Sequence, residues 1–78
     1  MIDTKELEND IMKSGLKRKA IARELGITTA GLSKKIRNLS EFRASEIEKL
    51  TKTLGWTRER RDQIFFNHNS DLKSTKGG

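Results

Sequence analysis

The apolar residues of this 78-residue chain recur three and four positions apart, and no proline interrupts them. That spacing places apolar side chains together on one face of an α-helix. Long runs of β-branched residues, which are typical of strands, are absent. The sequence therefore predicts an all-α fold, and its length is enough for one domain only.

Three short helices are expected in the first half of the chain. Asp3 and Glu6 form a capping-box pattern that opens a helix near residue 4, with Gly15 as its end. Leu16 is then expected to point inward. A second helix is expected over 18–25 with Gly26 as its end, and a third from the N-cap Thr28 to about residue 37, where Asn38 tolerates the left-handed conformation.

Two further helices are expected after a short loop. Ile47, Leu50 and Leu54 repeat at helical spacing in the fourth helix, which Gly55 ends. Its start is left open, because Arg43 is a poor cap and Ser45 is an alternative one. Thr57 can cap a fifth helix. Core packing is expected for the apolar residues of these segments, namely Leu7, Ile11, Leu50, Leu54 and Trp56.

Composition excludes several classes of protein. Without cysteine the chain has neither disulfides nor thiolate metal ligands, and a single histidine, His68, cannot build a zinc site. A catalytic site is not expected either, since Tyr is also missing and no Gly-rich phosphate loop occurs. No metal, cofactor or membrane partner is expected, because no apolar run approaches the ~18 residues of a membrane helix. These features predict a soluble, cytoplasmic protein that is not an enzyme.

The positive charge is concentrated in one stretch. The whole chain has a net charge of +6, whereas residues 13–37 carry eight Lys and Arg against Glu24 alone, a net charge of +7. A cationic cluster of this kind suits a phosphate-bearing partner, because each neutralised phosphate releases condensed counterions. The alternative is an ordinary solvated helix face.

The segment 18–37 reads as two short helices joined by a tight turn. Ala22 is small where the two helices cross, and Gly26, four residues later, suits a turn that needs positive φ. Such geometry directs the start of the second helix outward, where it fits a DNA major groove about 12 Å wide. An ordinary helical hairpin in a small bundle is the alternative.

This segment resembles the helix-turn-helix of the Cro/C1-type (xenobiotic-response-element-like) family of phage repressors. The resemblance is carried by Ile21, Ala22, Leu25, Gly26, Ile27, Leu32 and Ile36. Over residues 5–67 the chain also resembles short prophage-encoded regulators of Gram-positive bacteria, through the runs IARELGIT, LSKKI, SEFRASEIEKL and RDQIFF. It departs from the family pattern at Lys17 and Arg43, where Ser or Thr caps are usual, and at Asn38, where Gly is common.

The resemblance implies a compact four- or five-helix lambda-repressor-like domain, expected over residues 1–68. Residues 69–78 are small and polar, and are expected to form a tail without fixed structure. It implies a Cro-like repressor that binds a palindromic operator in double-stranded DNA as a homodimer, in the bacterial cytoplasm and nucleoid. Residues implied to contact bases are Thr28, Thr29, Ala30, Ser33 and Lys34. Residues implied to contact phosphates are Arg18, Lys19, Lys35, Arg37, Asn38 and Arg43. Each of these positions could instead be plain solvated surface.

The apolar cluster near the end of the fifth helix leaves two interpretations open. Ile64, Phe65 and Phe66 hold more apolar area than one side of a short helix can bury. Phe65 and Phe66 could form a dimer contact, or they could belong to the core. Two other functions remain alternatives: a DNA-binding antitoxin of a toxin-antitoxin pair, and an adaptor that binds a partner protein through the Phe65/Phe66 surface.

Overall fold

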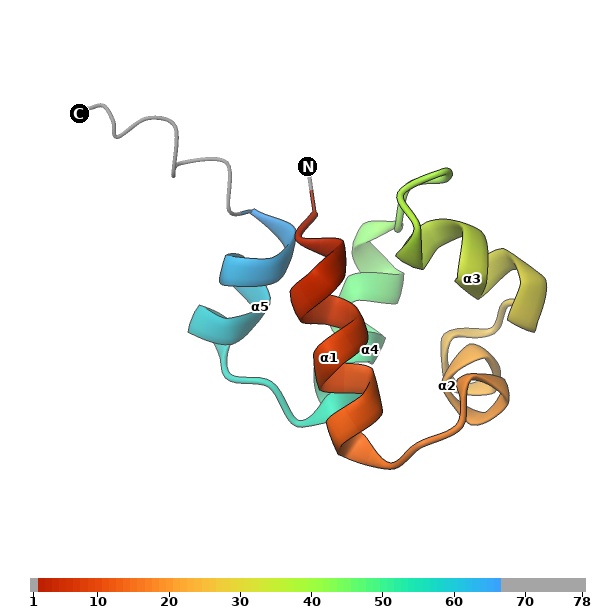
Figure 1. Cartoon of the computed structure of the whole chain (residues 1–78), viewed down its shortest axis with the longest axis horizontal. Helices are drawn as coiled ribbons and strands as arrows, with labels where there is room; N and C mark the ends of the chain where they lie inside the picture. The colour runs from red at the N-terminus through yellow and green to blue at the C-terminus, as the bar shows by residue number, and fades with distance from the viewer. Residues whose placement is uncertain (1, 67–78) are drawn as a thin grey trace.

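The computed structural model describes residues 2–66, and within them the chain forms five α-helices and no strand (Figure 1). The helices are α1 (Thr4–Ser14), α2 (Arg18–Leu25), α3 (Thr29–Ile36), α4 (Ala44–Leu54) and α5 (Arg58–Phe65). The all-α prediction is confirmed. His68 and the predicted tail, 69–78, lie outside the described residues.

The helix starts follow the capping residues of the sequence. Side-chain oxygens of Asp3, Thr28 and Thr57 each accept a hydrogen bond from the backbone N–H three residues on, over 3.1, 2.9 and 3.0 Å respectively. These bonds satisfy N–H groups that have no partner inside the helix. The predicted starts of α1, α3 and α5 are therefore confirmed.

The helix ends also lie where the sequence places them. α1, α2 and α4 each end at a glycine with a φ of 70–75°, and Asn38 follows α3 with a φ of 64°. After α3 the amide of Leu39 donates to the carbonyl of Lys34 over 2.8 Å, which closes the last turn. Asn38 thus takes the conformation that glycine takes elsewhere in the chain.

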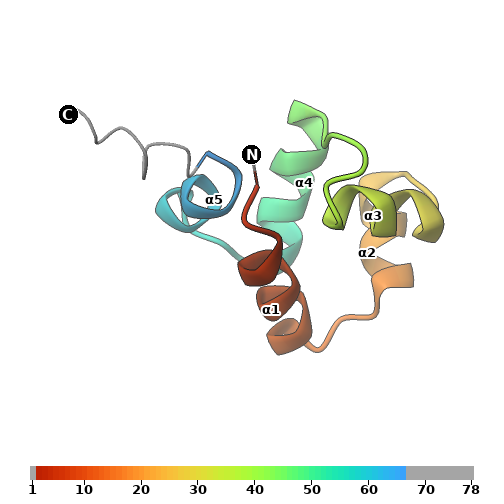
Figure 2. The same cartoon turned by 45° about the horizontal axis from the view of Figure 1, so that its top comes forward.

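One core joins all five helices. α1 contacts α3, α4 and α5, whereas α2 packs against α3 and α4. In both views α2 and α3 lie at one end of the molecule and α5 lies at the other (Figures 1 and 2). The fully buried side chains come from every helix: Leu7, Ile21, Leu32, Ile36, Leu50 and Ile64. Leu54 and Trp56 pack against this core while remaining partly exposed.

The start of α4 is two residues earlier than a Ser45 cap would give. Arg43 is the N-cap, and its backbone N–H donates to Oε1 of Glu46 over 2.9 Å. The carboxylate of Glu46 therefore supplies one half of a capping box, while the Arg43 side chain, which has only donors, accepts no bond from the helix amides.

One expectation about an apolar residue is wrong. Leu16 does not point inward but is 40% exposed, because it lies in the surface link between α1 and α2. The two interpretations left open for Phe65 and Phe66 divide between the two residues, since their exposed fractions are 5% and 44%. Phe65 is the last residue of α5, whereas Phe66 follows it as the C-cap with a φ of −127°, so the backbone leaves the helical path between the two rings.

Phe65 is held in the core by other aromatic rings. Its ring meets those of Phe42 and Trp56 edge to face, with centroids 5.2 and 5.9 Å apart. Edge-to-face pairs at these distances are favourable beyond the apolar area they bury. Phe65 is therefore a core residue, and Phe66 alone of the two is exposed.

Candidate nucleic-acid interface

The turn between α2 and α3 consists of Gly26, Ile27 and Thr28. The amide of Ile27 donates to the carbonyl of Ala22 over 3.0 Å, and Gly26 between them has a φ of 75°. Ala22 is buried at the packed side of α2. The small residue and the glycine thus occupy the positions that the sequence assigned to them: a buried contact and a left-handed turn.

α3 presents two different faces. Leu32 and Ile36 are fully buried against the core. Ala30, Lys34 and Arg37, at spacings of four and three, are exposed. Residues at these spacings share one side of a helix. The outer face of α3 therefore carries Lys34 and the methyl group of Ala30, and Arg37, the C-cap directly after the helix, extends that face.

The first turn of α3 is also accessible. Thr28 and Thr29 are exposed and Ser33 is half-buried. The Oγ1 atom of Thr28 is the N-cap acceptor for the amide of Gly31, over 2.9 Å. A Cβ atom added at Gly31 would lie only 3.0 Å from that Oγ1, which gives a local structural reason for glycine at this position. Four of the five predicted base-contact residues, all except Ser33, are fully on the surface.

Most of the predicted phosphate contacts lie on the surface as well. Lys19, Arg37, Asn38 and Arg43 are exposed. Within the described part of the chain, none of the three cations among them forms an ion pair. Their charges are therefore available to an external anion.

Arg18 differs because it has an acidic neighbour. One of its guanidinium nitrogens lies 3.5 Å from Oε2 of Glu8 in α1, and both side chains are partly exposed. Exposed pairs of this kind contribute little to stability. A phosphate could therefore replace Glu8 as the partner of Arg18 at small cost.

Two further exposed cations were not predicted as contacts. Lys17 is the N-cap of α2 and Arg23 lies on its outer side. Neither forms an ion pair within residues 2–66. The concentration of charge in residues 13–37 included both residues, so the charge pattern could have identified them.

Lys35, which was also predicted to contact a phosphate, differs from these exposed cations. Its side chain is only 13% exposed, and its Nζ lies 2.5 Å from Oε1 of Glu46. Burial by itself raises the pKa of Glu46, but hydrogen bonds from the Arg43 amide and the Lys35 ammonium outweigh it and lower that pKa below its ordinary value. Glu46 is therefore charged at neutral pH, and Lys35 is occupied inside the protein.

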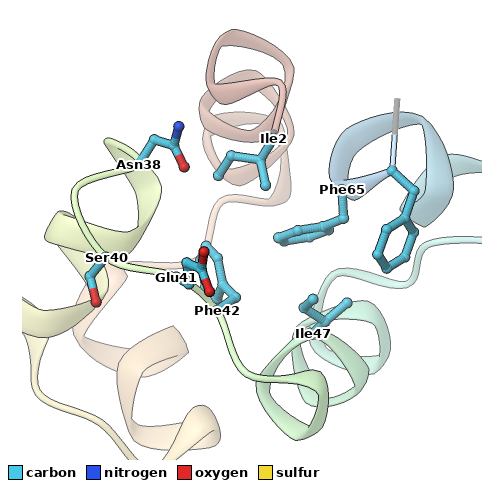
Figure 3. Close-up of a pocket in the computed structure, with 8 residues that line it drawn as sticks. Ile2, Asn38, Ser40, Glu41, Phe42, Ile47 and Phe65 are labelled. Carbon is cyan, nitrogen blue, oxygen red and sulfur yellow. The ribbon is translucent and has the colours of Figure 1, made fainter. Parts of the chain in front are cut away.

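A hollow lined by both apolar and polar side chains lies beside this surface. It has a volume of about 340 Å³ and is lined by Ile2, Asn38, Ser40, Glu41, Phe42, Ile47, Phe65 and Phe66 (Figure 3). A second hollow adjoins it, since Ile47 and Phe66 line both, and Glu48 and Arg61 lie at its edge. We call these two neighbouring hollows together the Phe66 groove; residues from the start of the chain, the α3–α4 loop, α4 and the end of α5 line them.

Within residues 2–66, no cluster of three or more His, Asp or Glu side chains is arranged to hold a metal ion. None of the five helices is long and apolar enough to cross a membrane. Comparisons of the chain with protein-family models, with curated proteins and with solved structures found no match.

Proposed function

We propose that this chain is a sequence-specific DNA-binding regulator of transcription, in which α2 and α3 act as a lambda-repressor-like helix-turn-helix. The observation that supports this most strongly is the outer face of α3. It combines the exposed cations Lys34 and Arg37 with small side chains and carries no acidic residue. A helix with such a face fits the major groove without a bulky or anionic obstacle.

The side chains at the start and along the outer side of α3 suit base recognition. Lys34 can donate to O6 or N7 of guanine, and the Ser33 hydroxyl can bond several base edges. The methyl groups of Thr29 and Ala30 suit contact with the methyl group of thymine. The Thr28 hydroxyl accepts from the Gly31 amide, which leaves its hydrogen free to donate to a base or a phosphate.

The remaining cations would set affinity and register. Arg18 and Lys19 lie at the start of α2, whereas Arg37, Asn38 and Arg43 lie beyond the end of α3. Contacts on both sides of the inserted helix would hold it in place along the duplex, without reading sequence themselves. Lys35 takes no part in phosphate contact in this proposal, because Glu46 already binds it.

A second copy of the chain is the proposed occupant of the Phe66 groove. Two copies with a net charge of +6 each repel one another, so they would meet through a surface that is not cationic. The charged residues along the groove are Glu41, Glu48 and Arg61, which hold both signs. A two-fold axis would allow Glu48 of one copy to approach Arg61 of the other.

Such a dimer would bind two half-sites about 34 Å apart on one side of the duplex and act by covering a promoter, as a Cro-like repressor does. The test is selection of bound duplexes from a random pool. The proposal predicts a palindromic sequence among the selected duplexes. A pool that stays random after selection would contradict sequence-specific binding.

A further inference from the structure

Lys34 and Lys35 are adjacent in sequence but face different surroundings. Lys34 is exposed on the outer side of α3. Lys35 is largely buried and its ammonium is bound to Glu46, the one buried charged residue in the described part of the chain. Lys34, which is proposed to contact a base, is thus followed directly by Lys35, whose side chain is fixed inside the protein.

One carboxylate oxygen of Glu46 binds both α3 and the start of α4, and the loop between the two helices lies beside it. Its Oε1 accepts from the Lys35 ammonium at the end of α3, over 2.5 Å, and from the Arg43 amide at the start of α4, over 2.9 Å. The same ammonium lies 6.0 Å from the centre of the Phe42 ring in the loop between them. The end of α3, the α3–α4 loop and the start of α4 therefore meet at this carboxylate.

The other contacts that hold α3 are mainly apolar. Leu32 and Ile36 bury its inner face, and within residues 2–66 the bond from Lys35 to Glu46 is the one side-chain hydrogen bond that joins α3 to another helix. An ion pair with a hydrogen bond at short distance is directional. The Lys35–Glu46 pair is thus the contact on α3 best suited to fix its rotation.

A small rotation matters for reading bases. Side chains of an α-helix reach about 5–6 Å from its axis, so a rotation of about 10° moves the tip of an outer side chain by about 1 Å. Recognition geometry tolerates displacements of about 0.5 Å. Loss of the pair would therefore misplace Lys34, although it removes no atom of the surface that meets DNA.

From these contacts we infer that Glu46 is a positioning residue: it acts through Lys35 to set the orientation of α3, and thereby the sequence discrimination of the protein. This inference rests on the proposed function. Buried ion pairs contribute little net stability when both partners are replaced together. We therefore expect the Lys35–Glu46 pair to affect sequence discrimination in DNA binding more than the stability of the fold.

The test uses the double variant K35M/E46Q in the full chain. Met keeps the apolar stem of Lys35, Gln keeps an acceptor for the Arg43 amide, and the net charge does not change. We expect the affinity for a scrambled duplex to stay within about twofold, because charge sets nonspecific binding. The preference for the duplex that the wild-type chain selects should fall at least tenfold. K35R, which keeps a cation, should retain most of that preference.

A matched control is K52M/E59Q, which removes one cation and one anion that are both exposed. It should leave discrimination unchanged. If K35M/E46Q folds and discriminates as well as the wild-type chain, the inference is overturned. Equal losses in K35M/E46Q and the control would overturn it as well.

A second measurement on the free protein keeps this inference separate from the proposed function. The amides of Asn38 and Leu39 donate to the carbonyls of Lys35 and Lys34 over 3.0 and 2.8 Å. In K35M/E46Q these two amides should exchange hydrogen at least tenfold faster, while the Trp56 amide, bonded to Thr51 at the end of α4 over 3.0 Å, should keep its rate. Unchanged exchange would overturn the role of Glu46 even if DNA binding is real. Faster exchange in a protein that prefers no sequence would contradict only the proposed function.

Discussion

Arg60 of α5 binds Asp10 of α1 through two hydrogen bonds, with Nε 2.9 Å from Oδ2 and Nη2 2.9 Å from Oδ1. The indole of Trp56 donates to the same carboxylate over 2.8 Å, and Glu6 accepts from Arg60 over 2.6 Å. A carboxylate that receives three donors from a guanidinium and an indole is held firmly. This cluster links the N-terminal helix to the C-terminal one.

The first prediction concerns acid stability. The hydrogen bonds from Arg60 lower the pKa of Asp10 below its ordinary value of 3.8, although burial opposes them. A carboxyl group whose pKa is lower in the folded protein than in the unfolded chain stabilises the folded protein when the pH is above the unfolded-state pKa. This contribution is lost as the pH falls through the folded-state pKa. D10N should therefore cost about 1–3 kcal/mol of unfolding free energy at pH 7, and less at an acidic pH well below 3.8.

Urea unfolding at the two pH values checks this prediction. The control is D62N, since the carboxylate of Asp62 is half exposed and its partner is the neighbouring Arg61. D62N should change the unfolding free energy by less than about 0.5 kcal/mol. A loss in D10N that is the same at both pH values would contradict the pKa assignment.

The second prediction concerns Gly26 in the α2–α3 turn. Its φ is 75°, and a Cβ atom there would meet nothing within 4 Å. G26A should therefore lose only the cost of a left-handed backbone, about 1–2 kcal/mol. G55A is the matched case, with a φ of 70° and the same open space, and should lose a similar amount. A loss well above 2 kcal/mol in G26A alone would mean that the turn is packed more tightly than the structure shows.

The third prediction separates base reading from phosphate binding. K34A should relax discrimination at one base pair, by about 1–3 kcal/mol. R18A should weaken binding to all duplexes about equally and lower the salt slope of log K by about 1. K52A, on an exposed position of α4, serves as the control. If K34A and R18A give the same uniform loss, Lys34 does not read a base.

The fourth prediction concerns the Phe66 groove. F66E should convert a dimer of the free chain into a monomer, because it places a charge in the apolar contact. Phe66 is already 44% exposed, so the fold should survive the change. M12E is the matched control, since Met12 is 77% exposed at a different place. Sedimentation equilibrium checks both, and a wild-type chain that is monomeric at high concentration would exclude the proposed dimer.

Much of the fold could be predicted because its helix ends are local. Thr28 and Gly26 mark boundaries through their own hydrogen bonds and backbone angles, which a short sequence window reveals. The start of α4 was harder to predict, because its N-cap, Arg43, has no side-chain acceptor for a helix amide. The bond at that helix start runs from the Arg43 amide to the carboxylate of Glu46 instead.

The sequence predicts where the candidate site lies, but it does not predict the role of every residue in it. Helical spacing identifies the outer face of α3 once Leu32 and Ile36 are taken as core. The roles of Lys34 and Lys35 differ because only the second points toward Glu46, and residue type cannot show this. The same applies to Phe65 and Phe66, since either phenylalanine of an adjacent pair could have been the buried one.

The most direct test of DNA binding through α3 is an NMR titration of the full chain with the duplex it selects. The largest amide shifts should lie at the start and on the outer side of α3, at Thr29, Ala30 and Lys34, with smaller ones at the start of α2. Amides around Asp10 and Arg60 should not move. Shifts that gather around Phe66 instead, or none at all at saturating duplex, would contradict the proposed interface.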